Sequence, residues 1–266
     1  MIVAIDTGGT KTLIECFDAD GTKTFVDKFP TPLATDEYVD QVATVVSQLN
    51  AVDAIVVAMP GIVEDGVISF MGNLPWRNFD VQTALKKRLP DVPIFIENDA
   101  NLGGVGEVRS RDSAPSRCLY LTVSTGIGGG FIVDGHIDPF LATTEVGHMR
   151  LEFDGKLQRW EHFASGKAIT KVWGKMASEI TRASDWEAIA LRVSRGLLAL
   201  LPSLRPELII IGGGVGTHYE KFSHPLQKIL ERNLEPLYLC PIERAAYPEE
   251  AVIYGCYYYA IDALAR

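Results

Sequence analysis

The chain has 266 residues, of which 47% are hydrophobic and 22% are charged. This length suits two small α/β domains, and the composition excludes a largely disordered chain. The net charge of −9 disfavours nucleic acid as a partner, because a phosphate backbone requires a basic face. The apolar runs are too short to cross a membrane, and the start of the chain has no signal-peptide pattern. The four scattered cysteines, without a CxxC pair, are typical of a reducing compartment, so we expect a cytoplasmic protein. From the short apolar runs we expect no membrane partner.

The first part of the chain alternates short strands with turns. Strands are predicted over residues 2–6, 11–18 and 24–29, and the first two are joined by a glycine turn. Apolar residues at helical spacing predict a helix around residues 36–49. Further strands are predicted over residues 54–59 and 94–96, with a helix over residues 81–88 between them. The polar segment 109–117 is the candidate linker.

The middle of the chain repeats the plan of its start. Strands over residues 119–123 and 131–133 flank a glycine turn at 124–130 and precede a turn at Asp134 and Gly135. This order suggests two related halves, and a chance similarity of two hairpins is the alternative. The rest is predicted as a strand over residues 208–211 and helices over residues 166–180, 186–201, 219–234 and 249–264.

The first glycine turn has the composition of a phosphate site. Adjacent Gly8 and Gly9 let the backbone N–H groups approach phosphate oxygens, while Thr10 adds a hydroxyl and Lys11 a cation. Asp6 ends the preceding strand and can hold Mg²⁺ through water. A plain hairpin turn is the alternative, but the Asp-x-Gly-Gly-Thr-Lys grouping is more specific. It matches neither the Walker pattern nor a dinucleotide fingerprint.

Two further glycine clusters follow predicted strands. Thr125, Gly126 and Gly128 belong to a segment with four glycines in five residues, whose entropic cost is explained by close approach to a ligand. Gly213 and Gly214 follow a buried strand and can accept an adenine ring or ribose against bare backbone. The alternative for the last cluster is a turn that starts a helix.

Polar groups elsewhere suggest a base and a sugar site. Asp99 ends a strand beside Asn98, where a carboxylate suits a general base, although position alone favours a helix N-cap. Glu145 and His148 flank a glycine and can hydrogen-bond a polyol, although an isolated histidine is more often structural. Glu161 stands in a stretch whose simplest interpretation is a solvated turn.

Taken with their order, these motifs resemble the ROK family (repressors, open reading frames and kinases) of sugar kinases. The likeness covers nearly the whole chain and is carried by residues 6–11, 97–101, 124–130, 145–148, 161 and 212–214. It implies that Asp99 is the catalytic base of a phosphoryl transfer. It also implies ATP with Mg²⁺ as cofactors, a sugar and a nucleotide as small-molecule partners, and a homodimer. The sugar ligands implied are Asn73, Asn98, Asp99, Glu145, His148 and Glu161.

Some features depart from the family pattern. Many members carry a cysteine zinc cluster before the later glutamate, whereas residues 149–160 contain no cysteine, so we expect no structural zinc. The glycine-rich approach to Glu145 is replaced by residues 139–144. Both features resemble the polyphosphate glucokinase branch, while the acidic balance and the turn at Gly213 favour ATP. The helix-turn-helix domain of repressor members is expected to be absent.

The expected fold is the α/β, two-domain actin-like ATPase (ribonuclease H-like) fold with an interdomain cleft. The small domain would comprise residues 1–112 and 249–266, and the large domain residues 113–248. The expected reaction moves the γ-phosphoryl group of ATP to a hydroxyl, O6, of a hexose such as glucose. The alternatives are a polyphosphate-dependent glucokinase, a kinase of N-acetylmannosamine or fructose, a non-catalytic sugar sensor, and a chaperone-type ATPase without a sugar site.

Overall fold

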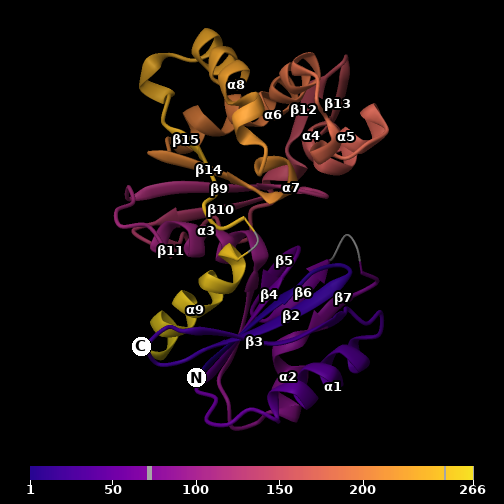
Figure 1. Ribbon diagram of the computed structural model, residues 1–266, viewed down its shortest axis with the longest axis vertical. Helices are drawn as coiled ribbons and strands as arrows, with labels where there is room; N and C mark the ends of the chain where they lie inside the picture. The colour runs from indigo at the N-terminus through magenta and orange to yellow at the C-terminus, as the bar shows by residue number, and fades with distance from the viewer. Residues whose placement is uncertain (71–73, 249, 266) are drawn as a thin grey trace. The chain divides into compact units, whose positions relative to one another are not determined.

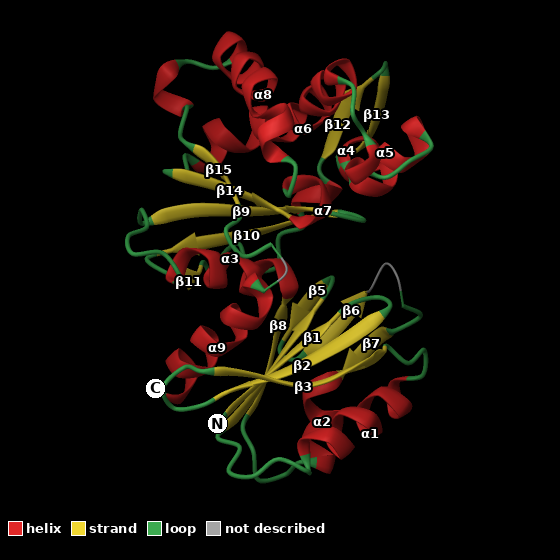
Figure 2. Cartoon of the chain, viewed as in Figure 1, coloured by secondary structure: helices red, strands yellow, loops and turns green. Residues whose placement is uncertain are grey.

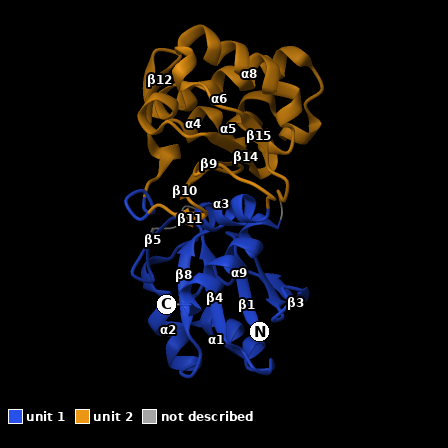
Figure 3. Cartoon of the chain, turned by 90° about the vertical axis from the view of Figure 1, so that its left-hand side faces the viewer, with its two compact units in different colours: residues 1–110, 139–143, 250–266 blue, residues 111–138, 144–249 orange. Residues whose placement is uncertain are grey.

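A computed structural model describes residues 1–70, 74–248 and 250–265. The chain forms two compact units, coloured separately in Figure 3. Unit 1 comprises Met1–Ser110, Pro139–Thr143 and Glu250–Arg266, and unit 2 comprises Arg111–Asp138 and Thr144–Glu249. The predicted division did not include the return of Pro139–Thr143 to unit 1. This segment is attached there through the Ala142 carbonyl, which accepts a hydrogen bond from Asn101 Nδ2 at 2.8 Å.

Unit 1 is built on a five-stranded sheet with the order β3-β2-β1-β4-β8 (Figure 1). Its strands are β1 (Ile2–Thr7), β2 (Lys11–Phe17), β3 (Lys23–Pro30), β4 (Ala54–Met59) and β8 (Ile94–Asn98). β1 is antiparallel to β2 and parallel to β4, which is in turn parallel to β8. The carboxyl ends of β1, β4 and β8 therefore lie at one edge of the sheet, where open α/β sheets bind ligands.

Helices cover both faces of this sheet (Figure 2). They are α1 (Thr35–Val46) and α2 (Val81–Arg88) on one face, and α3 (Asp99–Arg109) and α9 (Ala251–Leu264) on the other. Successive strand residues point to opposite faces. Val3 and Ile5 therefore pack with α1 and α2, while Ile2 and Ala4 pack with α9. Burial on both sides explains why the central strands are apolar at nearly every position.

A small antiparallel sheet in unit 1 was not predicted. Its strands are β5 (Ile62–Glu64), β6 (Val67–Phe70) and β7 (Arg77–Asp80), in that order. They fill the connection between β4 and α2, and α2 is capped by Asp80, whose side chain accepts a hydrogen bond from the Thr83 backbone N–H. The cap explains why α2 begins where the sequence predicts it.

Unit 2 repeats the strand plan of unit 1. Its main sheet has the order β11-β10-β9-β14-β15. The strands are β9 (Arg117–Val123), β10 (Ile127–Val133), β11 (His136–Ile137), β14 (Leu208–Gly212) and β15 (Ile242–Arg244). β9 is antiparallel to β10 and parallel to β14, as β1 is to β2 and β4. The two halves therefore share one strand topology, and the repeat extends beyond the two hairpins from which it was predicted.

The remaining elements of unit 2 pack around this sheet. They are η1 (Val146–His148), β12 (Arg150–Phe153), β13 (Lys156–Arg159), α4 (Glu161–Ala164), α5 (Gly166–Trp173), η2 (Ala177–Glu179), α6 (Ala183–Leu204), α7 (Gly213–Gly216), α8 (Tyr219–Asn233) and η3 (Pro236–Tyr238). Trp160 and Trp186 are buried in the core, and each indole N–H donates to a backbone carbonyl. Across the described parts of both units, no helix combines the length and apolar character needed to span a membrane.

Two predicted elements of unit 2 have different limits in the structure. The glycine turn is confined to Ser124, Thr125 and Gly126, because Gly128 pairs with Thr122 inside β10. Ladder hydrogen bonds override the weak strand propensity of glycine there. The predicted helix over residues 166–180 ends at Trp173, because Gly174 adopts a left-handed conformation with φ of 69° and caps α5.

Candidate active site

The predicted site residues fall into two groups, one in each unit. In unit 1, the sheet register aligns Asp6 of β1 with Ala58 of β4, and Ala58 with Glu97 of β8. The glycine turn follows directly after β1, and Asp99 follows directly after β8. The parallel strands β1, β4 and β8 therefore carry the first glycine turn and the candidate base to the same edge of one sheet.

The turn after β1 is held on one side and open on the other. Gly8 N–H donates to the Lys11 carbonyl at 2.9 Å, and Thr10 and Lys11 are exposed. On the buried side, Thr31 donates its hydroxyl to the Gly8 carbonyl at 2.8 Å and its N–H to the Thr10 carbonyl at 3.1 Å. No sequence motif includes Thr31, which lies far along the chain from the turn that it supports.

Asp6 has the environment of a candidate magnesium residue. Burial raises the pKa of its carboxyl to about 6, and the charge of Lys28 opposes this shift. One partly buried carboxylate at a strand end does not supply enough ligands for a metal site made of protein groups alone. It does fit Mg²⁺ held largely by water and phosphate oxygens, which is the usual arrangement for this ion.

The junction between β8 and α3 separates the roles of Asn98 and Asp99. The N-cap of α3 is Asn98, whose Oδ1 accepts hydrogen bonds from the backbone N–H groups of Ala100 and Asn101 at 2.9 and 3.0 Å. Asp99 is the first helical residue, and its Oδ1 also accepts a hydrogen bond from the Ala100 backbone N–H at 2.8 Å, so Asn98 and not Asp99 is the N-cap. Asn98 Nδ2 also donates to the Gly61 carbonyl, which leaves one amide hydrogen for a sugar hydroxyl.

Two further residues of the 97–101 motif, Glu97 and Asn101, support this junction, although no role was predicted for either of them. Glu97 Oε1 accepts hydrogen bonds from the Asn98 backbone N–H at 2.7 Å and from Asn101 Nδ2 at 3.0 Å. Burial raises the pKa of Glu97, and both hydrogen bonds oppose that shift. Because the Glu97 carboxylate accepts a hydrogen bond from the Asn98 backbone N–H, it restrains the direction in which the chain enters α3 next to Asp99.

In unit 2, the turn after β9 contacts the candidate sugar residues. Ser124 accepts a hydrogen bond from the Gly166 N–H at 2.6 Å, which joins the turn to the start of α5. A Cβ atom at Gly126 would lie 3.0 Å from Glu161 Oε2, so this glycine lies directly against the Glu161 carboxylate. Thr125 is exposed at the tip of the turn.

Glu145 and His148 flank Gly147 in and before η1, and this short helix packs against β10. A Cβ atom at Gly147 would lie 2.2 Å from the Ile127 carbonyl oxygen, so only glycine permits η1 to pack this closely on β10. His148 Nε2 lies 3.4 Å from Glu161 Oε1, and Arg159 Nη1 lies 3.5 Å from the same oxygen. Unit 2 thus brings Gly126, His148 and Glu161 together, with Arg159 as an unpredicted neighbour.

The electrostatics of this cluster suit hydrogen bonding to a neutral polyol. Burial raises the pKa of Glu145, and the nearby charge of Glu161 raises it further. Burial lowers the pKa of His148, against the opposing effect of Glu161. A neutral imidazole has one donor and one acceptor nitrogen, while a carboxylate accepts hydrogen bonds. The cluster therefore offers both kinds of partner that a sugar hydroxyl requires.

The third glycine cluster joins β14 to α7. Gly213 has φ of 77°, and a Cβ atom there would lie 2.7 Å from the Val123 carbonyl oxygen. Gly214 is exposed, and a Cβ atom there would meet no atom within 4 Å. Gly213 is thus required by the fold, whereas Gly214 presents open backbone that a ligand can approach.

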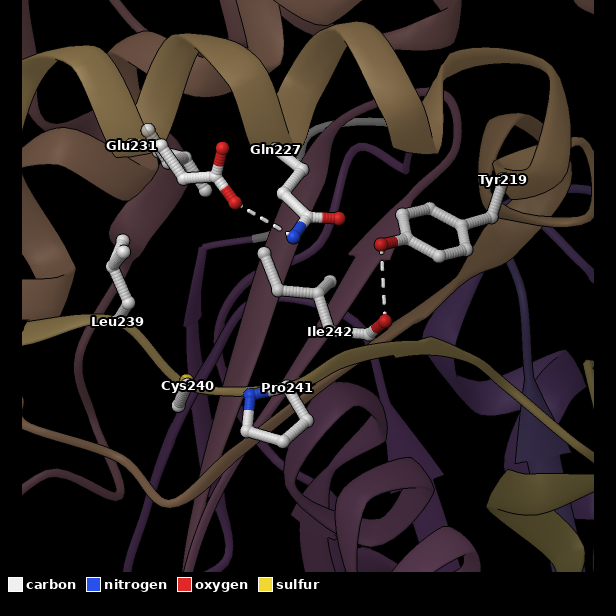
Figure 4. A pocket seen from close by; sticks show the side chains of 8 residues that line it. Tyr219, Gln227, Glu231, Leu239, Cys240, Pro241 and Ile242 are labelled. Carbon is white, nitrogen blue, oxygen red and sulfur yellow. Dashed lines mark hydrogen bonds between the residues drawn. The ribbon is translucent and has the colours of Figure 1, made fainter. Parts of the chain in front are cut away.

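The remaining candidate features add nothing to these two groups. Asn73 is outside the described residues. Within the described ranges, no three His, Cys, Asp or Glu side chains are grouped so that they could hold a metal ion. A cavity of about 250 Å³ in unit 2 lies between α8 and the segment leading into β15, with Tyr219, Gln227 and Cys240 in its lining (Figure 4). None of the predicted site residues lines this cavity.

Comparison with known proteins agrees with this geometry. The sequence matches the ROK family over residues 2–262. A fructokinase from Lactococcus lactis subsp. cremoris is 27% identical over 231 residues, which span 80% of this chain and 78% of the relative. The crystal structure of a ROK family glucokinase from Streptomyces griseus, in complex with glucose and AMPPNP, is 25% identical with a TM-score of 0.79. It covers 96% of this chain and 97% of that chain.

A second solved structure is similar over the whole chain. The inorganic polyphosphate/ATP-glucomannokinase from Arthrobacter sp. strain KM is 28% identical, with a TM-score of 0.72, and covers 100% of this chain and 99% of that chain. The fold is therefore the α/β actin-like ATPase fold, and the class is that of the sugar kinases. The chain belongs to the ROK family, as the sequence motifs predicted.

Proposed function

We propose that this protein transfers the γ-phosphoryl group of ATP to O6 of a hexose such as glucose, with Asp99 as the general base. The observation that carries the proposal is the shared carboxyl edge of β1, β4 and β8. The first glycine turn follows β1 and Asp99 follows β8, so both stand at this edge of one sheet. Phosphoryl transfer is catalysed mainly by positioning and charge stabilisation, and both are tasks for such an edge.

The donor would be bound through backbone groups. In the proposal, the turn containing Gly8 and Gly9 and the turn containing Thr125 and Gly126 direct N–H groups at phosphate oxygens. Lys11, exposed at the first turn, adds a positive charge. Gly213 and Gly214 would face the adenosine. Asp6 would hold Mg²⁺ through water, and the ion would supply positive charge that neutralises the phosphates.

The acceptor would be bound by amide, carboxylate and imidazole groups. Glu145, His148 and Glu161 would take sugar hydroxyls in unit 2, and Asn98 would donate its remaining amide hydrogen in unit 1. Asp99 would accept the proton of the attacking hydroxyl while that oxygen forms its bond to phosphorus and ADP leaves with the electron pair. The N-cap of α3 is Asn98, while Asp99 Oδ1 accepts a hydrogen bond from the Ala100 backbone N–H at 2.8 Å.

A second donor is supported by one comparison. The similar solved protein from Arthrobacter is named for both inorganic polyphosphate and ATP. Both donors present a chain of phosphate groups, and both glycine turns would serve either one. Fructose is the alternative acceptor, since fructokinases are among the similar proteins.

The test of the proposal is the variant Asp99→Asn, which keeps the size of the side chain. We expect turnover to fall by about 10²–10⁴-fold, because the substituted amide cannot accept the proton. Affinity for the nucleotide should stay unchanged in a calorimetric titration. The matched control is Asp91→Asn on an exposed turn, which should leave turnover unchanged. Normal turnover in Asp99→Asn would remove Asp99 from this role.

A further inference from the structure

Thr31 forms hydrogen bonds to two carbonyl groups of the turn at Gly8–Lys11, although no sequence motif includes this residue. It follows the last residue of β3 and is 7% exposed. Its hydroxyl donates to the Gly8 carbonyl at 2.8 Å, and its backbone N–H donates to the Thr10 carbonyl at 3.1 Å. One residue therefore holds two carbonyl groups of a turn that lies elsewhere in the sequence.

The hydroxyl of Thr31 is itself oriented by a second threonine. Thr12 Oγ1 and Thr31 Oγ1 are 3.0 Å apart, and Thr12 is fully buried. Since the Thr31 hydroxyl hydrogen is directed at Gly8, the hydrogen between the two hydroxyls comes from Thr12. The result is a buried hydrogen-bond chain from Thr12 through Thr31 to the Gly8 carbonyl.

These contacts fix the direction of two N–H groups. In a trans peptide, the C=O of one residue and the N–H of the next point in opposite directions. With the Gly8 carbonyl directed at Thr31, the Gly9 N–H points away from Thr31. With the Thr10 carbonyl directed at the Thr31 N–H, the Lys11 N–H also points away from it. Thr31 therefore directs both N–H groups away from the buried side of the Gly8–Lys11 turn.

The burial of the turn agrees with this arrangement. Thr7, Thr12 and Thr31 are buried, whereas Thr10 and Lys11 are exposed. A carbonyl buried without a hydrogen-bond donor is costly, so loss of the Thr31 hydroxyl would favour rotation of the Gly8–Gly9 peptide. Glycine offers little steric resistance to such a rotation.

We propose that Thr31 is a positioning residue that sets the Gly8–Lys11 turn for binding the phosphate chain of the donor. The inference rests on the proposed function, in which this turn binds that chain. It assigns Thr31 no contact with the donor or the sugar. Its effect should therefore be confined to donor affinity and should depend on the hydroxyl group.

The experiment compares the full-length wild type with Thr31→Val, which keeps the branched shape but removes the hydroxyl, and with Thr31→Ser, which retains it. Calorimetry measures the Kd of AMPPNP with Mg²⁺ and of tripolyphosphate with Mg²⁺. The matched control is Thr44→Val, which removes a threonine hydroxyl that donates to the Asp40 carbonyl on the exposed side of α1.

We expect Thr31→Val to weaken binding of the donor by about tenfold or more. Thr31→Ser should stay within about threefold of the wild type, and Thr44→Val should match it. The Kd of the sugar should be the same in all four proteins. If Thr31→Val does not fold, Thr12→Val takes its place, since it removes the hydrogen bond that orients the Thr31 hydroxyl, and it should weaken donor binding too.

The outcomes separate this inference from the function on which it rests. Unchanged donor affinity in Thr31→Val would overturn the role of Thr31, and the same holds for Thr12→Val if that variant is used instead. The proposed function would stand in that case, provided that the wild type binds the donor. Equal losses of donor and sugar affinity would reduce Thr31 to a general structural role and overturn the inference. A wild type that binds neither AMPPNP nor tripolyphosphate would overturn both.

Discussion

Asp6 is a carboxylate whose surroundings favour the protonated form. Burial raises its pKa to about 6 from an ordinary value of 3.8, so ionisation of Asp6 at neutral pH costs stability in the absence of a cation. If Mg²⁺ is bound there with the donor, the same charge becomes useful. A group that destabilises the free protein and serves the bound state is typical of functional sites.

Replacing this carboxylate should stabilise the free protein. In the folded state Asp6 binds its proton more tightly than in the unfolded state, so its effect on the free energy of unfolding becomes more unfavourable as pH rises from about 4 to about 6. Asp6→Asn should therefore be more stable than the wild type at pH 8, by at most about 3 kcal/mol, and by about half as much at pH 5. Urea unfolding without ligands at both pH values measures this difference.

The activity of the same variant provides the second half of this prediction. Asp6→Asn should lose Mg²⁺-dependent turnover although it is more stable. A variant that is less stable than the wild type at pH 8 would contradict the pKa argument. A variant with normal turnover would contradict the magnesium role.

Residue types in the site were easier to predict than the residues that support them. Asp6, Gly8 and Lys11 stand together in the sequence, so the turn could be found from its composition. Thr31 acts through hydrogen bonds to backbone atoms of a distant segment. Such bonds leave no composition signal, because any residue supplies the same carbonyl or N–H. The capping of α3 by Asn98 rather than Asp99 was decided by a shift of one residue in the start of the helix.

At the scale of elements, the junction of β14 and α7 separates a structural glycine from an open one. Gly213 combines φ of 77° with a close approach to the Val123 carbonyl, while Gly214 has free space at its Cβ position. Alanine at Gly213 should cost about 1 kcal/mol or more of stability. Alanine at Gly214 should leave the Tm unchanged.

Only the second of these variants reports on the ligand. If bare backbone at Gly214 faces adenosine, Gly214→Ala should raise the KM for ATP several-fold and leave the KM for polyphosphate unchanged. Steady-state kinetics with both donors, together with the Tm of each variant, test this prediction. An unchanged KM for ATP would place the adenosine elsewhere.

Two elements of unit 1 were predicted with their limits, one because burial imposes an apolar pattern and the other because a capping residue marks its start. β4, with six buried residues, and α2, with its cap, agree with the predicted limits. The strands β5 to β7 and the hairpin of β12 and β13 were missed, since strands of three or four residues leave little periodicity to detect. The glycines of β10 were assigned to a turn because their strand conformation depends on pairing with β9.

For the molecule as a whole, the repeated topology is the strongest feature that the sequence indicated. Two sheets with the same order and the same pattern of parallel and antiparallel pairs each begin with strand, glycine turn and strand. The match to the ROK family over residues 2–262 agrees with that plan. The identity of the sugar was not predictable, since no motif includes neighbours of the candidate sugar residues such as Arg159 of β13.

The most direct test of the central claim is a phosphorylation assay of the purified wild type. It would combine glucose, fructose, mannose and N-acetylmannosamine, each with ATP–Mg²⁺ or polyphosphate–Mg²⁺, and measure the sugar phosphate formed. We expect transfer from ATP to at least one hexose, and this transfer should be lost in Asp99→Asn. Absence of any sugar phosphate with either donor, from a protein that still binds a sugar, would contradict it and favour a non-catalytic sugar sensor.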